Sequence, residues 1–202
     1  MTVIDSDAAL RDCYDPPGEL VQKKILRRLD QHARAFIALS PFAVLATHGP
    51  DGSDASPRGD APGFVQVVDD VTLLLPDRRG NNLIDSLRNV VASSEVGLLF
   101  LVPGINETLR VNGTAKVITD VARLEPMIAQ GKVPASALQI SVREVYFHCG
   151  KAMIRSDLWN ADRHVPRGSF PTLGRVIADQ VAGVDAEAAD VNLAESYKTR
   201  LY

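Results

Sequence analysis

Residues 96–120, VGLLFLVPGINETLRVNGTAKVITD, contain two runs with the composition of β-strands, separated by a Pro-Gly pair at 103–104. In the second run Leu109 and Val111 alternate with polar residues, which is the two-residue period of a strand with one buried face. A Pro-Gly pair between two such runs indicates a turn. The stretch therefore predicts two consecutive antiparallel strands.

Strand signals recur on both sides of this pair. FAVLATHG at 42–49 is a short β-type run closed by the turn residues GPDG, and GFVQVVDDVTLLLPD at 63–77 contains two apolar runs separated by an Asp-Asp pair. ALQISVREVYFHCG at 137–150 alternates with a period of two. Between the first two of these, SPRGDAPGF at 56–64 has the proline and glycine content of a turn that leads into a strand.

Apolar residues repeat at helical spacing in several other segments. The segments expected to be helical are 15–40, as one or two helices, 81–93, 120–131 with Gly131 at its end, 151–160 as a helix or tight turn, and 185–202. In the helix expected from Asn81, one face would carry four apolar residues, Leu83, Ile84, Leu87 and Val91.

The order of these signals predicts the fold class. Strands dominate residues 42–149 in hairpin order, with one helix inserted between them, and the sequence has no alternation of strands and helices typical of βαβ units. This order favours an antiparallel barrel over a doubly wound parallel sheet. We therefore expect a mainly β fold with an inserted helix and helical termini.

Composition limits the possible partners. The chain has 202 residues, of which 46% are hydrophobic and 23% charged, as is typical of one globular domain. A formal net charge of -3 gives no electrostatic reason to expect nucleic acid or an anionic membrane as partner. Apolar runs are shorter than the roughly 20 residues that span a bilayer. Two cysteines and the early aspartates favour a reduced, cytoplasmic setting.

Several kinds of active site have no signature in the sequence. The four histidines are scattered without metal-ligand spacing, and His148 and Cys149 point to opposite faces of the expected strand. The glycines form neither a phosphate loop nor a dinucleotide-binding fingerprint. The sequence thus gives no support for a zinc site, a conventional nucleophile or a Walker-type nucleotide site.

Arginines at the edges of the expected strands are the remaining candidates for chemistry. Arg58 lies at one strand edge, and Arg78 and Arg79 precede the inserted helix. A helix N-terminus offers unpaired N–H groups and guanidinium groups offer paired donors, a combination that suits a phosphate. Structural roles also stay open, with Arg58 as a surface residue paired with Asp60 and Asn81 as a helix N-cap.

Five blocks occur in one order along residues 30–160: SPRGD at 56–60, LLLPDRRGNNLIDSLRN, VGLLFLVPG, ETLRVNGTA and YFHCGKAMIRSDLW. This order resembles the FMN-binding split β-barrel proteins related to pyridoxamine 5'-phosphate oxidase, and the PRGD, DRRGNN and HCGKA blocks are most similar to an uncharacterised bacterial branch of that family. The resemblance implies an antiparallel split β-barrel domain over 30–160. An N-terminal helical extension would cover 1–29, and a C-terminal helical tail at 161–202 would pack on the same domain.

The resemblance also implies a set of FMN-binding residues. By analogy, Arg58 reaches the FMN phosphate or ribityl chain, Gly59 permits close approach of the backbone, and Asp60 orients the arginine. A lysine that the family carries near the inserted helix is absent here. The phosphate would therefore be held by the loop before that helix, through Arg79, Asn81 and Asn82.

Other residues would contact the flavin ring. In the oxidase a Gln-Val-Arg-Val-x-Gly strand runs beside the flavin, and here Thr108 and Arg110 stand in the places of glutamine and arginine. Proteins of this family are homodimers with FMN at the subunit interface. Lys151, Arg155 and Trp159 would then approach the flavin from the partner chain, with the tryptophan covering a ring edge and the lysine offsetting charge on reduced flavin. An interface or core role stays open for Trp159, and a structural role for Arg155.

The resulting expectation is an FMN-dependent oxidoreductase that acts on an unidentified small molecule. The family's oxidase ends in an arginine-rich strand that completes its pyridoxal phosphate pocket, whereas this chain ends in AESYKTRLY, so pyridoxamine phosphate oxidation is not expected. Two alternatives stay open. One is a flavin carrier, sensor or storage protein without turnover, and the other is an enzyme that uses a deazaflavin or haem on the same barrel.

Overall fold

The structure, a computed structural model, describes residues 3–202. Its strands are β1 (Phe42–Gly49), β2 (Gly52–Gly59), β3 (Gln66–Val67), β4 (Thr72–Asp77), β5 (Glu95–Leu101), β6 (Thr108–Ile118) and β7 (Ser136–His148). Its α-helices are α1 (Asp7–Arg11), α2 (Glu19–Lys23), α3 (Gln31–Leu39), α4 (Asp85–Ser93), α5 (Val121–Leu124), α6 (Lys151–Ser156), α7 (Leu173–Gln180) and α8 (Ala186–Thr199). Short 3-10 turns are η1 (Glu125–Met127), η2 (Ala161–Arg163) and η3 (Arg167–Ser169).

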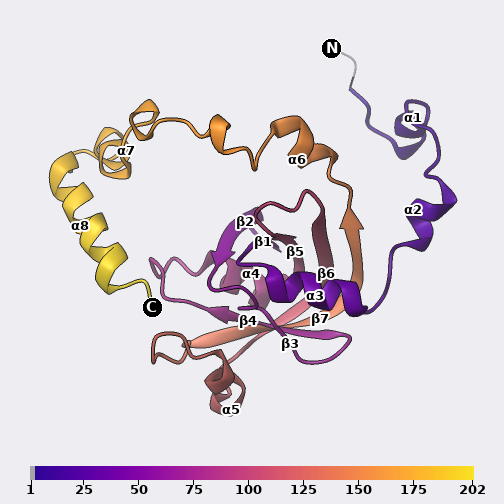
Figure 1. Ribbon diagram of the computed structural model, residues 1–202, viewed down its shortest axis with the longest axis horizontal. Coiled ribbons are helices and arrows are strands. Elements are labelled where there is room, and N and C mark those ends of the chain that lie inside the picture. Colours follow the sequence, from indigo (N-terminus) through magenta and orange to yellow (C-terminus); the bar gives the residue numbers. More distant parts are fainter. Residues whose placement is uncertain (1–2) are drawn as a thin grey trace.

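Within residues 3–202 the strands form one seven-stranded sheet in the order β2-β1-β5-β6-β7-β4-β3, and neighbouring strands are antiparallel. The edge strands β2 and β3 do not pair with each other in this part of the chain, so the sheet is open. Figure 1 shows β4 and β7 running across the direction of β1 and β2, with α4 inserted beside the sheet. The predicted fold class, an antiparallel split β-barrel with an inserted helix, is confirmed.

One face of each central strand makes the core. Leu109 and Val111 of β6 are buried, as the alternation predicts, and Phe100 of β5 is fully buried. Helix α3 packs onto this core through its own apolar face, and the ring of Phe36 meets that of Phe147 edge-on with centroids 5.4 Å apart. Burial of each such side chain contributes roughly 1.5–3 kcal/mol, so the pattern that marks the strands also stabilises the barrel.

The stretch at 56–64 differs from its prediction as a turn. Residues 56–59 continue β2, so Arg58 is a strand residue, and the turn follows later, where the N–H of Phe64 donates to the carbonyl of Ala61 at 3.1 Å. Strand β2 lies at the edge of the sheet, and its residues are alternately half-buried and exposed. Most of its side chains are small or polar, and no apolar period marks the strand in the sequence.

The turn after β2 depends on Gly63, which has a φ of +79 after Pro62, the geometry of a type II turn. We expect Gly63→Ala to destabilise the fold by about 1–2 kcal/mol, because an L-residue in this region costs that much. Its Cβ would also lie 3.3 Å from the carbonyl oxygen of Ala38. Urea unfolding measures the loss.

The control for this substitution is Gly168→Ala. Gly168 lies outside the left-handed region, and a Cβ there would meet nothing within 4 Å. Its replacement should leave the free energy of unfolding unchanged within about 0.5 kcal/mol. Equal losses in the two variants would contradict the backbone explanation.

Helix α4 begins at Asp85 and not at Asn81 as predicted. Asn82 and Ile84 have φ values of 62 and 54, a left-handed backbone that cannot continue an α-helix. Ile84 occupies the N-cap position, so the N-cap role expected as an alternative for Asn81 is wrong. The Asn81 side chain instead accepts a hydrogen bond from the N–H of Leu83 at 3.0 Å.

The buried face of α4 also differs from the prediction. Ser86 and Val90 are its buried residues, and the Ser86 hydroxyl donates to the carboxylate of Asp54 at 3.0 Å. Three of the four apolar residues expected on its inner face are exposed: Leu83 and Ile84 precede the helix, and Val91 is an exposed residue within it.

The helix predicted over 120–131 is shorter than expected. Helix α5 and the turn η1 end at Met127, and Gly131 does not end a helix. Gln130 and Gly131 have positive φ values of 47 and 75 and form a tight turn closed by backbone hydrogen bonds between the residues on either side. This turn carries Lys132, which becomes part of the cavity described below.

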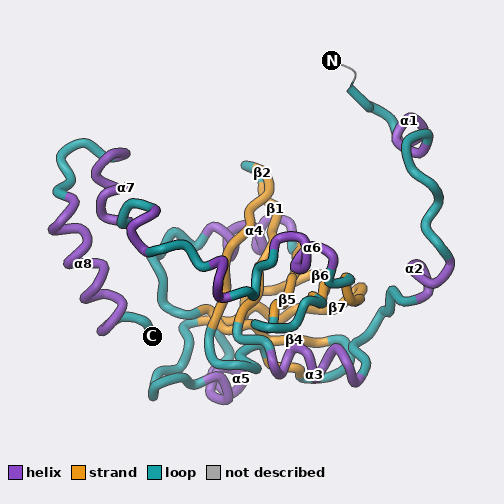
Figure 2. Tube along the Cα trace, turned by 45° about the horizontal axis from the view of Figure 1, so that its top comes forward, coloured by secondary structure: helices purple, strands orange, loops and turns teal. Residues whose placement is uncertain are grey.

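Helices α1 and α2 at one end of the chain, and α7 and α8 at the other, extend away from the barrel, as Figure 2 shows. Helices α1 and α2 contain no buried residue, and α7 and α8 pack on each other. After α8 the chain returns to the barrel and ends at Tyr202. The domain boundaries at 29/30 and 160/161 stay predictions. Among residues 3–202, no helix is both long and apolar enough to cross a membrane.

Candidate functional site

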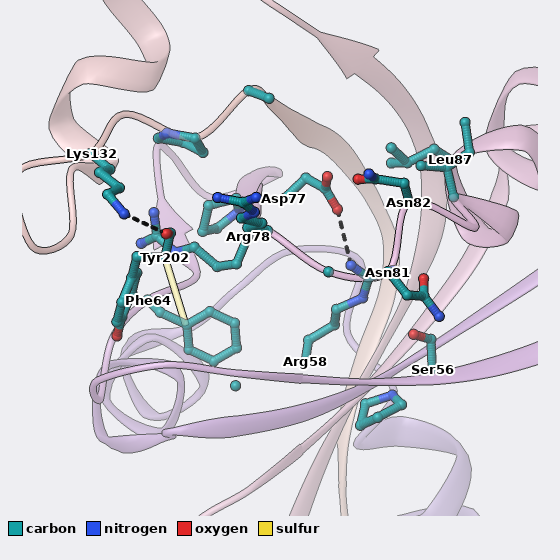
Figure 3. A pocket seen from close by; sticks show the side chains of 18 of the residues that line it. Ser56, Arg58, Phe64, Asp77, Arg78, Asn81, Asn82, Leu87, Lys132 and Tyr202 are labelled. Carbon is teal, nitrogen blue, oxygen red and sulfur yellow. Dashed lines mark hydrogen bonds and ion pairs between the residues drawn. The ribbon is translucent and has the colours of Figure 1, made fainter. Parts of the chain in front are cut away.

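A cavity of about 840 Å³ opens beside the ends of β2 and β4 and the loop before α4 (Figure 3). Its apolar wall includes Phe64 and Leu87. The polar side chains that line it are Ser56, Arg58, Asp77, Arg78, Arg79, Asn81, Asn82, Lys132 and Tyr202. Cations and hydrogen-bond donors outnumber the carboxylates in this set, so the cavity suits an anionic ligand.

Arg58 enters the cavity from the end of β2. Its Nη1 donates to Oδ1 of Asp77 at 3.1 Å, and the two side chains are only 20% and 24% exposed (Figure 3). Its Nε is buried and meets no hydrogen-bond acceptor among the described residues. Such an N–H is rare, because leaving it unsatisfied costs about 1–3 kcal/mol. The guanidinium is therefore suited to a further acceptor.

Gly59, the next residue, also lines the cavity. A Cβ at this position would lie 3.3 Å from the carbonyl oxygen of Pro41. The small residue thus allows close packing against the chain's own backbone. Its predicted approach to a ligand stays a prediction.

Asp60 does not pair with Arg58, contrary to the prediction. Its side chain is only 4% exposed and accepts hydrogen bonds from Nε of Arg78 at 2.6 Å and from the hydroxyl of Tyr202 at 2.7 Å. Strand β2 ends at Gly59, so the strand geometry that would place Asp60 on the same face as Arg58 does not continue. Asp60 therefore orients Arg78 and not Arg58.

The Asp60 contacts change two pKa values. Burial opposes ionisation of Asp60, but hydrogen bonds from Tyr202, the Ala61 N–H and Arg78, with the Arg78 charge, outweigh burial and lower its pKa below the ordinary 3.8. The hydrogen bond to Asp60, with burial, raises the pKa of Tyr202 above its ordinary 10.0. At neutral pH Asp60 is thus ionised and Tyr202 protonated, and neither is poised for proton transfer.

The predicted phosphate loop lies at the same cavity. Arg79, Asn81 and Asn82 line it and are exposed. Within residues 3–202 no ion pair joins Arg79 to an acidic side chain. Ile84 at the start of α4 also lines the cavity, so the helix N-terminus faces the same space. Guanidinium and amide donors therefore converge there, beside the start of α4.

Thr108 and Arg110 lie elsewhere on the sheet and do not line this cavity. Thr108 is buried opposite His148. Arg110 donates to Glu144 at 3.3 Å and lies 4.3 Å from the centre of the Tyr146 ring, and its buried Nε also meets no acceptor among the described residues. Burial and nearby positive charges lower the pKa of His148.

Lys151, Arg155 and Trp159 also lie outside the cavity of their own chain. The first two are exposed on α6. The indole Nε1 of Trp159 donates to the carbonyl of Ile105 at 2.9 Å, which anchors the half-buried ring to the turn between β5 and β6. The predicted contacts of the three residues with a flavin on a partner chain stay predictions.

Lys132 and Tyr202 are cavity residues that sequence patterns do not indicate. They lie 70 residues apart, and no local motif marks either one. Arg78 is indicated only by its place beside Arg79 in DRRG. The structure separates the two arginines, because Arg78 pairs with Asp60 whereas Arg79 faces the cavity without such a partner among the described residues.

The described residues contain no group of three or more His, Cys, Asp or Glu side chains arranged to hold a metal ion. The donors of the cavity are mainly guanidinium, ammonium and amide groups, which bind anions. The arrangement can therefore hold a phosphate or carboxylate.

Three solved structures are similar to part of this chain. HupZ of Group A Streptococcus is 21% identical, with a TM-score of 0.49 over 59% of this chain and 93% of that one. An FMN-binding protein from Syntrophomonas wolfei is 12% identical, with a TM-score of 0.46 over 58% and 84% of the two chains. A protein from Clostridium acetobutylicum related to general stress protein 26, of the pyridoxinephosphate oxidase family, is 15% identical, with a TM-score of 0.42 over 58% and 85%.

No curated protein matches the chain in sequence. The family model for pyridoxamine 5'-phosphate oxidase matches residues 29–149, which is more than half of the chain. The matched residues contain the whole sheet and the cavity side chains from Ser56 to Asn82. The resemblance seen in the sequence blocks is thus confirmed, and the chain belongs to the pyridoxamine 5'-phosphate oxidase family.

Proposed function

We propose that the protein is a flavoprotein whose cavity binds the phosphate of FMN through Arg58, Arg79, Asn81 and Asn82. The observation that carries the proposal is the Arg58 guanidinium, which Asp77 fixes and whose buried Nε meets no acceptor among the described residues. A guanidinium held in this way matches the oxygens of a phosphate. Membership of the family supports the choice of FMN.

The size and walls of the cavity fit this ligand class. Its volume of about 840 Å³ lies in the range of roughly 300–1,000 Å³ that is usual for small-molecule sites. Arg79 can take the place of the lysine that the family carries, because its side chain is exposed at the cavity. Phe64 and Leu87 offer apolar surface beside the donors.

The cavity residues bind and orient the ligand, and neither Asp60 nor Tyr202 is poised to exchange a proton near neutral pH. Bound FMN supplies hydride or electron transfer. Asp77 holds Arg58 in place for the phosphate, and Asp60 holds Arg78, which also lines the cavity. We propose that the reaction is an oxidation or reduction of a small molecule.

The exposed free cysteines Cys13 and Cys149 support a cytoplasmic setting.

We also propose a homodimer in which one chain completes the flavin site of the other. Lys151, Arg155 and Trp159 lie outside the cavity of their own chain, so a second copy is the simplest way to bring them to its flavin. The buried Nε of Arg110, without an acceptor among the described residues, supports a further partner there. Sedimentation as a monomer with and without FMN would contradict this part.

FMN should bind at least tenfold more tightly than riboflavin, which has the same ring but no phosphate. A tenfold difference corresponds to about 1.4 kcal/mol, less than one charge-assisted hydrogen bond can contribute. Titration of the purified protein with each flavin, followed by flavin fluorescence, measures the ratio. Equal affinities would contradict a phosphate site. Uptake of haem or a deazaflavin, with no binding of FMN, would show that FMN is not the cofactor.

A flavin carrier without turnover is the second candidate. It is favoured by the cavity residue Tyr202 and its partner Asp60, which are hydrogen-bonded to each other and not poised for proton transfer. Steady-state assays of the FMN-loaded protein with reduced nicotinamides and quinones distinguish the two. A flavin-dependent rate supports the oxidoreductase, and tight FMN binding with no rate in any assay supports the carrier.

A further inference from the structure

Tyr202 lines one side of the cavity (Figure 3). It contacts three separate segments of the chain, through Asp60, Arg78 and Lys132. Its hydroxyl donates to Asp60 at 2.7 Å, and its ring lies 5.7 Å from the guanidinium carbon of Arg78. Its main-chain oxygen accepts from Nζ of Lys132 at 2.7 Å. Tyr202 therefore contacts the Asp60 carboxylate, the Arg78 guanidinium and the Lys132 ammonium group at the same time.

These contacts hold Tyr202 to the barrel without deep burial. The residue is half-buried and Lys132 is exposed. Helix α8, which precedes the segment, contributes no buried residue of its own. The exposed contact with Lys132 is worth about 1 kcal/mol or less, whereas the hydrogen bond to the Asp60 carboxylate, which is 4% exposed, is worth about 1.5–3 kcal/mol. A ligand that offers both contacts can therefore displace the segment.

Two of the groups that hold Tyr202, Asp60 and Arg78, are also fixed by contacts that do not involve Tyr202. Asp60 is 4% exposed and fixed by Arg78, which itself donates to the carbonyl of Met127 at 2.8 Å. The Asp60 carboxylate lies at one end of the tyrosine and the Lys132 ammonium at the other, with Arg78 along the ring. The three groups thus match an aromatic ring that carries a hydroxyl at one end and an anionic oxygen at the other.

We propose that Asp60, Arg78 and Lys132 form a second ligand subsite of the cavity, which takes a phenolic carboxylate and which Tyr202 occupies in the absence of that ligand. The ligand's hydroxyl donates to Asp60, its ring packs on Arg78 and its carboxylate binds Lys132. The subsite lies on the wall away from Arg58, whose partner is Asp77. The use of this subsite for a substrate rests on the proposed flavin function, whereas the binding of a phenolic carboxylate there does not.

The test uses 4-hydroxyphenylacetate as probe and calorimetry of the full chain without added flavin. Tyr202→Ala removes the competing ring and hydroxyl, so it should bind the probe at least tenfold more tightly than the unchanged protein. Phenylacetate, which lacks the hydroxyl, should bind Tyr202→Ala at least fivefold more weakly than the probe. Adding Lys132→Ala to Tyr202→Ala should weaken binding of the probe at least tenfold. Adding Lys116→Ala, at an exposed position of β6, should leave the affinity for the probe unchanged.

If Tyr202 only stabilises the fold and covers no ligand subsite, the opposite pattern is expected. If Tyr202→Ala lowers the melting temperature but binds the probe no better than the unchanged protein, the subsite proposal fails. It also fails if Lys132→Ala leaves probe binding intact. Tyr202→Phe, which keeps the ring, gives a folded comparison that should bind the probe with intermediate affinity. An FMN titration of the same samples separates the two claims, since lost FMN binding with retained probe binding contradicts only the flavin proposal.

Discussion

Arg58→Ala is expected to weaken FMN binding by about 1.5–3 kcal/mol, which is roughly a 10- to 150-fold rise in Kd. The change removes a guanidinium whose Nε is buried without an acceptor among the described residues. It also leaves the Asp77 carboxylate, 24% exposed, without its 3.1 Å partner beside the phosphate. Both effects oppose an anionic ligand. A fluorescence titration with FMN gives the Kd.

Two further variants make this result specific. Arg58→Lys keeps the positive charge but loses the paired donors, so its loss of affinity should be smaller than that of Arg58→Ala. Arg27→Ala removes an exposed arginine outside the cavity and should leave Kd unchanged. Unaltered affinity in Arg58→Ala would reduce Arg58 to a structural partner of Asp77.

Asp60→Asn is expected to destabilise the fold by about 3 kcal/mol, because removal of one partner from a buried ion pair leaves the other uncompensated. The Asp60 side chain is 4% exposed and that of Arg78 is 19% exposed. Asparagine keeps the size of the residue but cannot offset the Arg78 charge. Urea unfolding at neutral pH measures the loss, and Asp5→Asn at an exposed position provides the control.

The same variant should change the acid stability of the protein. The folded-state pKa of Asp60 is lowered, so its ionisation stabilises the fold above the ordinary value of 3.8, and this contribution disappears as the pH falls through the lowered pKa. Asp60→Asn lacks the group, so its free energy of unfolding should fall less steeply below pH 3.8. Parallel pH profiles in the two proteins would show that Asp60 is not a source of acid sensitivity.

The parts of the fold that the sequence predicts correctly are those where local pattern and burial agree. Alternation marks β6 because Leu109 and Val111 face the core while their neighbours do not. Strand β2 has no such pattern, since it lies at the sheet edge with half-buried polar side chains. The late start of α4 was not predictable for another reason. Ile84 adopts a left-handed backbone that a β-branched residue disfavours, so its local preference does not indicate the helix start.

The residues of the candidate site also fall into those that local sequence predicts and those that it does not. Arg58, Arg79 and Asn81 are predicted from blocks of local sequence, and the structure brings them to one cavity. The pairing of Arg58 with Asp60 is wrong because closeness in sequence does not fix side-chain direction once a strand ends. Tyr202 reaches Asp60 across 142 residues, and no local pattern encodes a contact of that range.

The most direct test of the central claim is a crystal structure of the protein grown with FMN. The account predicts that the FMN phosphate lies in the cavity, with its oxygens within about 2.7–3.2 Å of side-chain nitrogens of Arg58 and Arg79. A phosphate bound elsewhere, such as beside Arg110 with the Arg58 cavity free of flavin, would contradict it.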